Sequence, residues 1–462
     1  MQIEFLGATR EVTGSCFLLR IGKYQLLVDC GLIQGSHRHE RHNHDPFLFD
    51  PEAIDAVVLT HAHLDHSGRL PLLIKRGYSG QIYTHRATVD LCAIMLEDAG
   101  YLNEKEVQWE NRKRERKGLE LIEPLYTRLE AREAHRHFRS VEYGKAEEIL
   151  PGITLTMHDA GHILGSAIAE LRLTDGQQTR NVVFSGDLGH RGAPILRDPE
   201  AVKRADLVIM ESTYGDRLHR SWDKTWQEMG EIISNARSGK GNIMIPAFAV
   251  GRTQELLYVF KRYFVEWGID DWEVFLDSPM AIEATEVYSN HAKIYDRRAK
   301  KVYEQSGDPF MLPNLHRTQR SDDSMKINRI KSGAIIIAGS GMCTGGRIKH
   351  HFKHNLWRED AHVLIVGFQA RGTLGRALVD GAKHIRLWGE TIRVKAQIHT
   401  IGGLSAHADQ QGLLNWYGHF ENRPPVVLVH GEPESMDGLA QRLKSEYRAD
   451  VVLAEFQQKL TL

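Results

Sequence analysis

The sequence predicts a layered α/β protein with more than one domain. Its 462 residues exceed the size at which a single hydrophobic core usually divides into separate domains. Short apolar segments alternate with glycine turns and longer amphipathic segments along the chain. Between about residues 207 and 387 this alternation becomes a series of strand–turn–helix units, which indicates a parallel, doubly wound sheet.

The first 200 residues begin with strands and then mix strands with helices. The expected strands are the apolar segments Ile3–Leu6, Cys16–Ile21, Tyr24–Val28, Ala56–Leu59, Gln81–Thr84, Thr154–His158, Ala167–Leu173 and Asn181–Ser185. Helices are expected at Leu70–Arg76 and Thr88–Leu102, and the almost wholly charged segment 103–118 would extend the second helix at the surface.

The doubly wound region and the tail are predicted in the same way. The strands expected in the region are Leu207–Met210, Asn242–Pro246, Glu273–Leu276, Ala334–Ala338 and His362–Val366. Ser306–Ser332 is polar and contains proline, so we expect a surface connection there. The tail returns to mixed strands and ends in a β–α–β unit at Pro425–Leu453.

Composition excludes several classes of protein. With 59 Lys and Arg against 60 Asp and Glu, the formal net charge is −1, so any nucleic-acid site must be a local basic patch. The four cysteines are scattered without a CxxC pair, which favours free thiols in a reducing compartment. The N-terminus lacks a basic-then-apolar signal, and no apolar run approaches the length of a spanning helix. We therefore expect a cytoplasmic protein without a membrane partner.

The segment HAHLDHSG, which begins at His61, is the strongest indication of function. If the preceding strand continues through His61 and His63, the two imidazoles point the same way, because strand side chains alternate. Asp65 and His66 follow in the next turn, within reach of a second ion. Imidazole and carboxylate suit zinc, and a catalytic zinc keeps one position open for water. The segment predicts a metallohydrolase; the alternative is a surface histidine cluster.

Three further residues of metal-ligand type each follow an expected strand. They are His162 in AGHILGSA, Asp187 in VVFSGDLG and His430 in VVLVHGE. Glycines on both sides of His162 allow the backbone to turn close to an ion. Any one of the three alone would more often be a structural or surface residue. Together with HAHLDH they supply two sets of ligands at sheet ends.

Seven motifs, in this order, resemble those of the metallo-β-lactamase superfamily and, within it, the β-CASP nucleases. LLVDCG with Asp29, HAHLDH, AGHILGSA and FSGDLG are similar to the four superfamily motifs. ESTYG with Glu211, GGLSAHAD with His407 and LVHGE with His430 are similar to β-CASP motifs A, B and C. The order of the motifs and the 23-residue step from His407 to His430 resemble those of the RNA-directed branch. That branch includes the endonuclease subunit of the eukaryotic cleavage and polyadenylation factor and its bacterial and archaeal relatives.

The resemblance, which covers essentially the whole chain, implies an αββα metallo-β-lactamase sandwich with an inserted β-CASP domain. Residues 1–206 and 388–462 would form the metallo-β-lactamase domain, and residues 207–387 would form the inserted doubly wound domain. The change in sequence pattern near residue 207 agrees with this division.

The resemblance also implies two zinc ions. The ligands that it assigns are His61, His63 and His162 for one ion and Asp65, His66 and His430 for the other, with Asp187 as the bridge. Asp29 is expected to orient ligands rather than to bind an ion. A hydroxide held between two zinc ions is a strong nucleophile at neutral pH, and the ions also stabilise charge on the scissile phosphate.

Hydrolysis also requires a proton for the departing oxygen. The resemblance implies that His407 is the general acid and that Glu211 holds its tautomer and favours its protonated form. The alternative is that His407 merely caps the helix expected near Asp409. The residues assigned to catalysis are thus Asp65, Glu211 and His407.

Glycine-rich turns that precede helices of the insert are candidates for phosphate binding, because backbone amides at helix starts attract anions. The side chains that would support them are Arg252, Arg347, Arg371, Arg376 and Ser405. The alternative is that these are ordinary turns of a doubly wound fold, and it stays open for each arginine.

We expect a zinc-dependent ribonuclease that hydrolyses RNA during RNA processing or decay. Cleavage is expected to be endonucleolytic, and 5′-exonuclease activity stays an open addition. A DNA nuclease of the Artemis type is the alternative, although that branch generally lacks a histidine in motif C. A small-molecule hydrolase would not need the insert, and a scaffold without catalysis would not need every ligand. A homodimer stays open, with the apolar tail Val451–Phe456 as a segment that could contribute.

Overall fold

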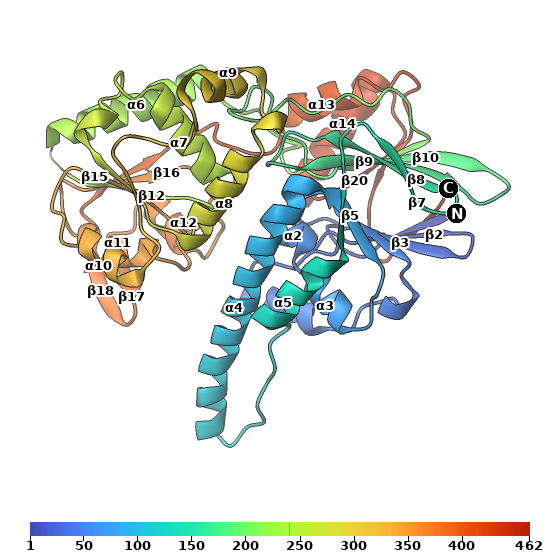
Figure 1. Ribbon diagram of the computed structural model, residues 1–462, viewed down its shortest axis with the longest axis horizontal. Coiled ribbons are helices and arrows are strands. Elements are labelled where there is room, and N and C mark those ends of the chain that lie inside the picture. Colours follow the sequence, from blue (N-terminus) through green and yellow to red (C-terminus); the bar gives the residue numbers. More distant parts are fainter. Residues whose placement is uncertain (240) are drawn as a thin grey trace. The chain divides into compact units, whose positions relative to one another are not determined.

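The computed structural model describes residues 1–239 and 241–462, apart from the side chains at positions 37, 238 and 239. The chain divides into two compact units (Figure 1). Unit 1 comprises Met1–Arg191, Arg197–Leu218 and His407–Leu462, and unit 2 comprises Gly192–Leu196 and His219–Ala406. The second unit is therefore an insertion in the first.

Unit 1 contains two seven-stranded sheets. In the first sheet the order is β22 (Lys459–Thr461), β1 (Gln2–Phe5), β2 (Phe17–Ile21), β3 (Tyr24–Val28), β4 (Ala56–Val58), β5 (Gln81–His85) and β6 (Phe138–Val141). In the second it is β21 (Val451–Leu453), β20 (Val426–Val429), β11 (Leu207–Glu211), β10 (Thr179–Phe184), β9 (Ala167–Thr174), β8 (Ile153–Asp159) and β7 (Ala146–Leu150). Both sheets are mixed: hairpins form one part of each, and parallel strands form the other.

The main core of unit 1 lies between these sheets. Because strand side chains alternate, Phe17 and Leu19 of β2 join one buried cluster with Leu171 and Leu173 of β9. The opposite face of the second sheet, which includes Ile168, packs on α13 (Gln410–Tyr417) and α14 (Pro433–Tyr447). Helices α3 (Leu70–Lys75), α4 (Arg86–Arg116) and α5 (Arg128–Ala134) lie along the first sheet (Figure 1). The layers are αββα, as expected.

Unit 2 contains a six-stranded sheet in which every neighbouring pair of strands is parallel. The order is β14 (Leu315–Arg317), β13 (Glu273–Leu276), β15 (Ala334–Ala338), β12 (Ile243–Pro246), β16 (His362–Ile365) and β19 (Gln397–Thr400). Helices α6 (Trp222–Gly239) and α7 (Arg252–Arg262) lie on one side of this sheet (Figure 1). On the other side lie α11 (Ile348–Asn355) and α12 (Leu374–Val379), which share a buried cluster with the strands. The doubly wound prediction is confirmed.

The structure changes two of the sequence expectations and confirms a third. Strand β11, which the sequence pattern assigned to the insert at 207–387, pairs with β10 and β20 in unit 1, so unit 2 spans 219–406 instead. The expected surface connection at Ser306–Ser332 contains β14 and the helix α10 (Ser321–Ile327). The charged segment after residue 102 does continue α4, which ends at Arg116. Among the described residues no helix is long and apolar enough to cross a membrane.

Candidate metal centre

Seven ligand-type side chains gather in unit 1 where strands of both sheets end. They are His61 and His63 after β4, Asp65 and His66 in α2 (Leu64–Ser67), His162 after β8, Asp187 after β10 and His430 after β20. The expectation that β4 continues through His61 and His63 is wrong, because the strand ends at Val58. The loop before α2 brings the two imidazoles together instead, and His63 immediately precedes that helix.

The first donor group has the dimensions of a tetrahedral zinc site. His63 Nδ1 lies 3.2 Å from His61 Nε2 and 3.1 Å from His162 Nε2. Asp187 Oδ2 lies 3.3 Å from His61 Nε2 and 3.5 Å from His162 Nε2. Zinc bonds of about 2.1 Å in a tetrahedron place the ligand atoms about 3.4 Å apart. The four side chains therefore fit zinc.

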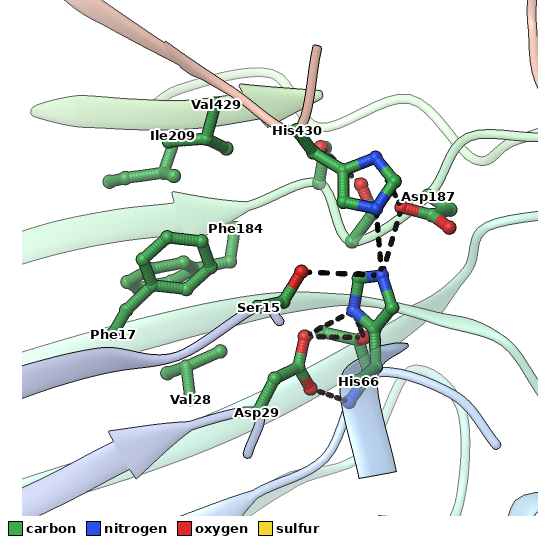
Figure 2. Close-up of a pocket in the computed structure, with 13 residues that line it drawn as sticks. Ser15, Phe17, Val28, Asp29, His66, Phe184, Asp187, Ile209, Val429 and His430 are labelled. Carbon is green, nitrogen blue, oxygen red and sulfur yellow. Dashed lines mark hydrogen bonds and ion pairs between the residues drawn. The ribbon is translucent and has the colours of Figure 1, made fainter. Parts of the chain in front are cut away.

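The second donor group lies on the other side of Asp187. His430 Nε2 is 3.3 Å from His66 Nε2 and 3.4 Å from Asp65 Oδ2. Asp187 Oδ1 is 3.4 Å from His66 Nε2, and Figure 2 shows Asp187 and His430 on the same side of the His66 ring. These spacings also fit a zinc ion.

Asp187 is the shared member of the two groups. Its oxygen Oδ2 belongs to the first group and Oδ1 to the second. Oδ1 is buried and makes no hydrogen bond of normal geometry to a described residue, although the His66 Nε2 atom lies 3.4 Å away. An ionised oxygen without a donor is costly to bury, and a cation compensates that cost. The carboxylate is thus placed to bridge two ions.

A layer of hydrogen bonds orients the histidines of the second group. Asp29 Oδ2 accepts a bond of 2.7 Å from His66 Nδ1 (Figure 2). The Asp29 carboxylate also accepts from the backbone amide and the hydroxyl of Thr60. The Thr213 hydroxyl lies 3.0 Å from His430 Nδ1. Each contact leaves Nε2 directed to the metal position. Sequence reasoning missed Thr60 and Thr213, although each stands beside or within a recognised motif.

The protonation states of the first group suit metal binding. Burial lowers the pKa of His63 to about 3 and also lowers the pKa values of His61 and His162, so these imidazoles are neutral. Burial raises the pKa of Asp187, but the charges of His430 and His66 outweigh it and hold the pKa well below its usual range. Neutral imidazoles and ionised carboxylates are the forms that bind zinc.

His66 differs from the other imidazoles. Burial lowers its pKa, but Asp187 and Asp29 outweigh burial and raise it well above the ordinary value. A zinc ion that binds His66 Nε2 must therefore displace a proton, so zinc affinity at the second group should rise with pH.

Two glycines allow the ligand loops to approach closely. A Cβ added at Gly31 would lie 1.7 Å from the carbonyl oxygen of Asp65. One added at Gly189 would lie 1.9 Å from the carbonyl oxygen of Gly161, next to His162. Any other residue at these positions would push a ligand loop away.

His407 and Glu211 form a pair beside the first donor group. His407 Nδ1 is 3.2 Å from both carboxylate oxygens of Glu211, and its ring centroid is 4.5 Å from that of His162. Glu211 is buried and also accepts a 2.6 Å bond from the Leu188 amide. Burial lowers the pKa of His407, but Glu211 and Asp187 outweigh it and raise the pKa to about 9. The capping alternative is wrong, because Asp409 caps α13.

Glu211 has a second geometric option. Donor atoms of Asp187, Glu211 and His430 all lie within 4.8 Å of one another, so the Glu211 carboxylate is also near the metal positions. The two distances from the Glu211 oxygens to His407 Nδ1 are 3.2 Å each, which is shorter than that limit of 4.8 Å.

The candidate phosphate contacts are dispersed in unit 2. Arg252 pairs with the buried Glu255 and donates to the Leu404 carbonyl, and Arg347 donates to Asp277 at 2.7 Å. The remaining three candidates lie nearer the surface: Arg376 pairs with Asp380, Arg371 is exposed, and Ser405 is half-buried. Phosphate binding at these five positions stays a prediction.

Models of three families match the chain. The metallo-beta-lactamase superfamily matches residues 9–235, and the Beta-Casp domain matches residues 253–378, which lie within unit 2. The Zn-dependent metallo-hydrolase RNA specificity domain matches residues 391–454, which include His407 and His430.

Individual relatives agree with these matches. Ribonuclease TTHA0252 of Thermus thermophilus is 40% identical over 456 residues, which cover 99% of each chain. Transcription termination factor FttA of Methanocaldococcus jannaschii is 33% identical and covers 94% of this chain and 67% of its own. A protein of unknown function from Enterococcus faecalis V583 shares the fold, with a TM-score of 0.54, 15% identity and coverage of 100% and 99% of the two chains. The chain belongs to the β-CASP ribonucleases of the metallo-β-lactamase superfamily, a family of zinc-dependent hydrolases.

Proposed function

We propose that the protein is a zinc-dependent endoribonuclease that holds two zinc ions. The observation that carries this proposal is the pair of donor groups that share Asp187, each with spacings that fit one ion. His61, His63 and His162 would hold the first ion. Asp65, His66 and His430 would hold the second. Bound zinc ions would lower the pKa of water and stabilise negative charge on a phosphodiester.

The chain's own residues would supply the proton for the departing oxygen. Glu211 accepts from His407 Nδ1, which fixes the tautomer and leaves Nε2 to carry the transferable proton. Burial lowers the pKa of His407, but Glu211 raises it, which would favour the protonated ring at neutral pH. Asp29 and Thr213 would hold the ligand rings in place while the substrate binds.

RNA is the substrate that the comparisons favour. The relative that matches almost the full length of both chains is named a ribonuclease, and the model that covers His407 and His430 is an RNA specificity domain. His430 lies in the second donor group, so the motif C histidine that Artemis-type DNA nucleases generally lack has a position in this site. We therefore propose RNA over DNA.

Replacement of His407 tests the catalytic assignment. His407→Ala should lower the rate of RNA cleavage by about 10²–10⁴-fold, the usual range for loss of a general acid, and zinc content should not change. His419→Ala, an exposed histidine in the same unit, is the control. Wild-type cleavage by His407→Ala would refute the assignment.

Substrate and polarity can be tested with matched nucleic acids. Linear RNA, circular RNA and DNA of one sequence should be digested side by side with metal analysis. An endoribonuclease cleaves the circle, whereas a 5′-exonuclease requires a free end. Cleavage of the DNA alone would reject the proposal.

A further inference from the structure

Unit 2 contains a cavity that the catalytic proposal does not use. Its volume is about 350 Å³, within the usual range for small-molecule sites. Its aromatic lining is formed by Trp222, Trp226 and Tyr258, and its charged lining by two arginines and two aspartates: Arg262, Arg298, Asp223 and Asp296. They come from α6, α7 and the start of α9 (Arg297–Ser306), three helices that Figure 1 labels. All of them belong to unit 2, whereas the metal centre belongs to unit 1.

The aromatic part of the lining is a rigid platform. The rings of Trp222 and Trp226 stack with centroids 5.2 Å apart and an angle of 16° between their planes. Trp226 is buried and Trp222 is half-buried, so the inner ring supports the outer one. A Cβ added at Gly192 would lie 3.5 Å from Trp222 Cδ1, so the backbone borders the edge of the indole. A supported indole that lines a cavity suits stacking of a planar ligand.

The polar part of the lining has unused hydrogen-bonding capacity. Tyr258 is only 5% exposed, yet its hydroxyl makes no hydrogen bond to any residue that the structure describes. Arg262 and Arg298 are exposed and have no carboxylate partner within the described part of the chain. Arg262 and Arg298 line the cavity together with the carboxylates of Asp223 and Asp296. Guanidinium groups beside carboxylates suit a ligand that carries both a phosphate and N–H donors.

We propose that this cavity binds one unpaired nucleotide of single-stranded RNA. The base stacks on Trp222, and Arg262 and Arg298 contact the adjoining phosphates. Asp296 already caps α9 through the Ala299 amide, so it is held in place and adds an acceptor for base N–H groups. The assignment to RNA rests on the proposed function, whereas the stacking and phosphate contacts rest on the cavity alone. A free nucleotide has the same chemistry and must be distinguished.

Binding should be measured on the full chain in the His407→Ala background, so that cleavage does not interfere. The probe is a fluorescent oligouridylate of about ten nucleotides, a length typical of single-strand sites. Trp222→Ala should weaken binding about 10-fold or more, and Trp222→Phe should restore part of the loss. Trp357→Ala, which removes an exposed tryptophan of unit 2 outside the cavity, should change binding less than about twofold.

The arginines supply a second variant that does not disturb the stacked rings. Arg262→Gln with Arg298→Gln removes two phosphate contacts, so it should weaken binding and reduce the magnitude of the slope of log affinity against log salt by about 1.4. Arg297→Gln with Lys301→Gln is the charge-matched control, because these exposed residues of α9 do not line the cavity. Its effect should be smaller.

Three outcomes would overturn the inference. They are wild-type affinity in Trp222→Ala, equal losses in the two charge variants, and tight binding of uridine monophosphate that depends on Trp222 while oligomer binding does not. The last would assign the cavity to a free nucleotide. Failure of the ribonuclease proposal is separate, because it appears in the cleavage and zinc assays and leaves these affinities unchanged.

Discussion

Asp29→Asn should weaken zinc binding at the second donor group and spare the first. In the wild type the Asp29 carboxylate accepts the Nδ1 proton of His66 at 2.7 Å, so Nε2 would present a lone pair to the proposed second ion. Asparagine keeps the size of the side chain and tolerates the positive φ of 60° at this position. Its amide nitrogen, however, donates to Nδ1 and favours the tautomer with the proton on Nε2. That tautomer cannot bind zinc.

The expected magnitude follows from the number of contacts that are lost. Thr60 makes two bonds to the same carboxylate, and an asparagine oxygen can keep the bond of 2.8 Å from the Thr60 amide. The substitution therefore acts mainly on the contact with His66. Loss of a contact that orients a ligand histidine lowers metal affinity by about 10–100-fold. That range corresponds to about 1.4–2.7 kcal/mol.

Competition with a chelator of known zinc affinity, combined with metal analysis, measures the effect. One zinc per chain should keep its wild-type affinity and the other should be bound more weakly. The control is Glu170→Gln, because Glu170 also contacts an imidazole, that of His158, at 2.7 Å but lies outside the donor groups. Two zinc ions bound with wild-type affinity in Asp29→Asn, or equal weakening of both, would refute the reasoning.

Three further predictions follow from other contacts. Glu211→Gln should keep both zinc ions but lower the pKa of His407, so the basic limb of the pH–rate profile should move down by about one pH unit or more; an unchanged limb contradicts the pairing. Gly189→Ala places a Cβ 1.9 Å from a carbonyl oxygen and should lower the free energy of unfolding by about 1–3 kcal/mol in denaturant titration, whereas wild-type stability would argue against close packing. Burial lowers the pKa of His158, but Glu170 and Glu200 raise it to about 9. These two ion pairs should therefore stabilise the fold fully below about pH 6.5 and progressively less as pH rises through 9. His158→Gln should remove that dependence, and an identical pH profile of stability would count against it.

The fold was predictable where strands are buried on both faces. The bounds expected for β15 match the structure, because its five buried apolar residues and flanking turns identify a central parallel strand without further context. The bounds expected for β13 also match, although Glu273 of that strand is exposed. Strand β14 was missed because it lies at the edge of its sheet and none of its residues is fully buried, so its sequence is polar. Strand β11 was expected correctly but placed in the wrong sheet, since an apolar run does not specify its partner.

The candidate site was predictable to the extent that its chemistry lies in compact motifs. The proposed ligands stand in such motifs, and the structure brings them together. The roles of Thr60 and Thr213 depend on which nitrogen of a histidine faces them, and no sequence pattern carries that information. The contact between Arg347 and Asp277 was also out of reach of sequence reasoning, because the two residues lie far apart in the chain; phosphate binding by Arg347 stays a prediction.

The position of His407 is determined by backbone contacts at a sheet end. His407 is the first residue of unit 1 after the insertion, and its backbone pairs with Gly189 while the next amide donates to the Leu188 carbonyl at 2.7 Å. Gly189 and Leu188 directly follow Asp187, so the backbone contacts that place the proposed acid also place it beside the shared ligand. Both contacts lie within unit 1, so the backbone of unit 1 itself holds the proposed acid beside the proposed shared ligand.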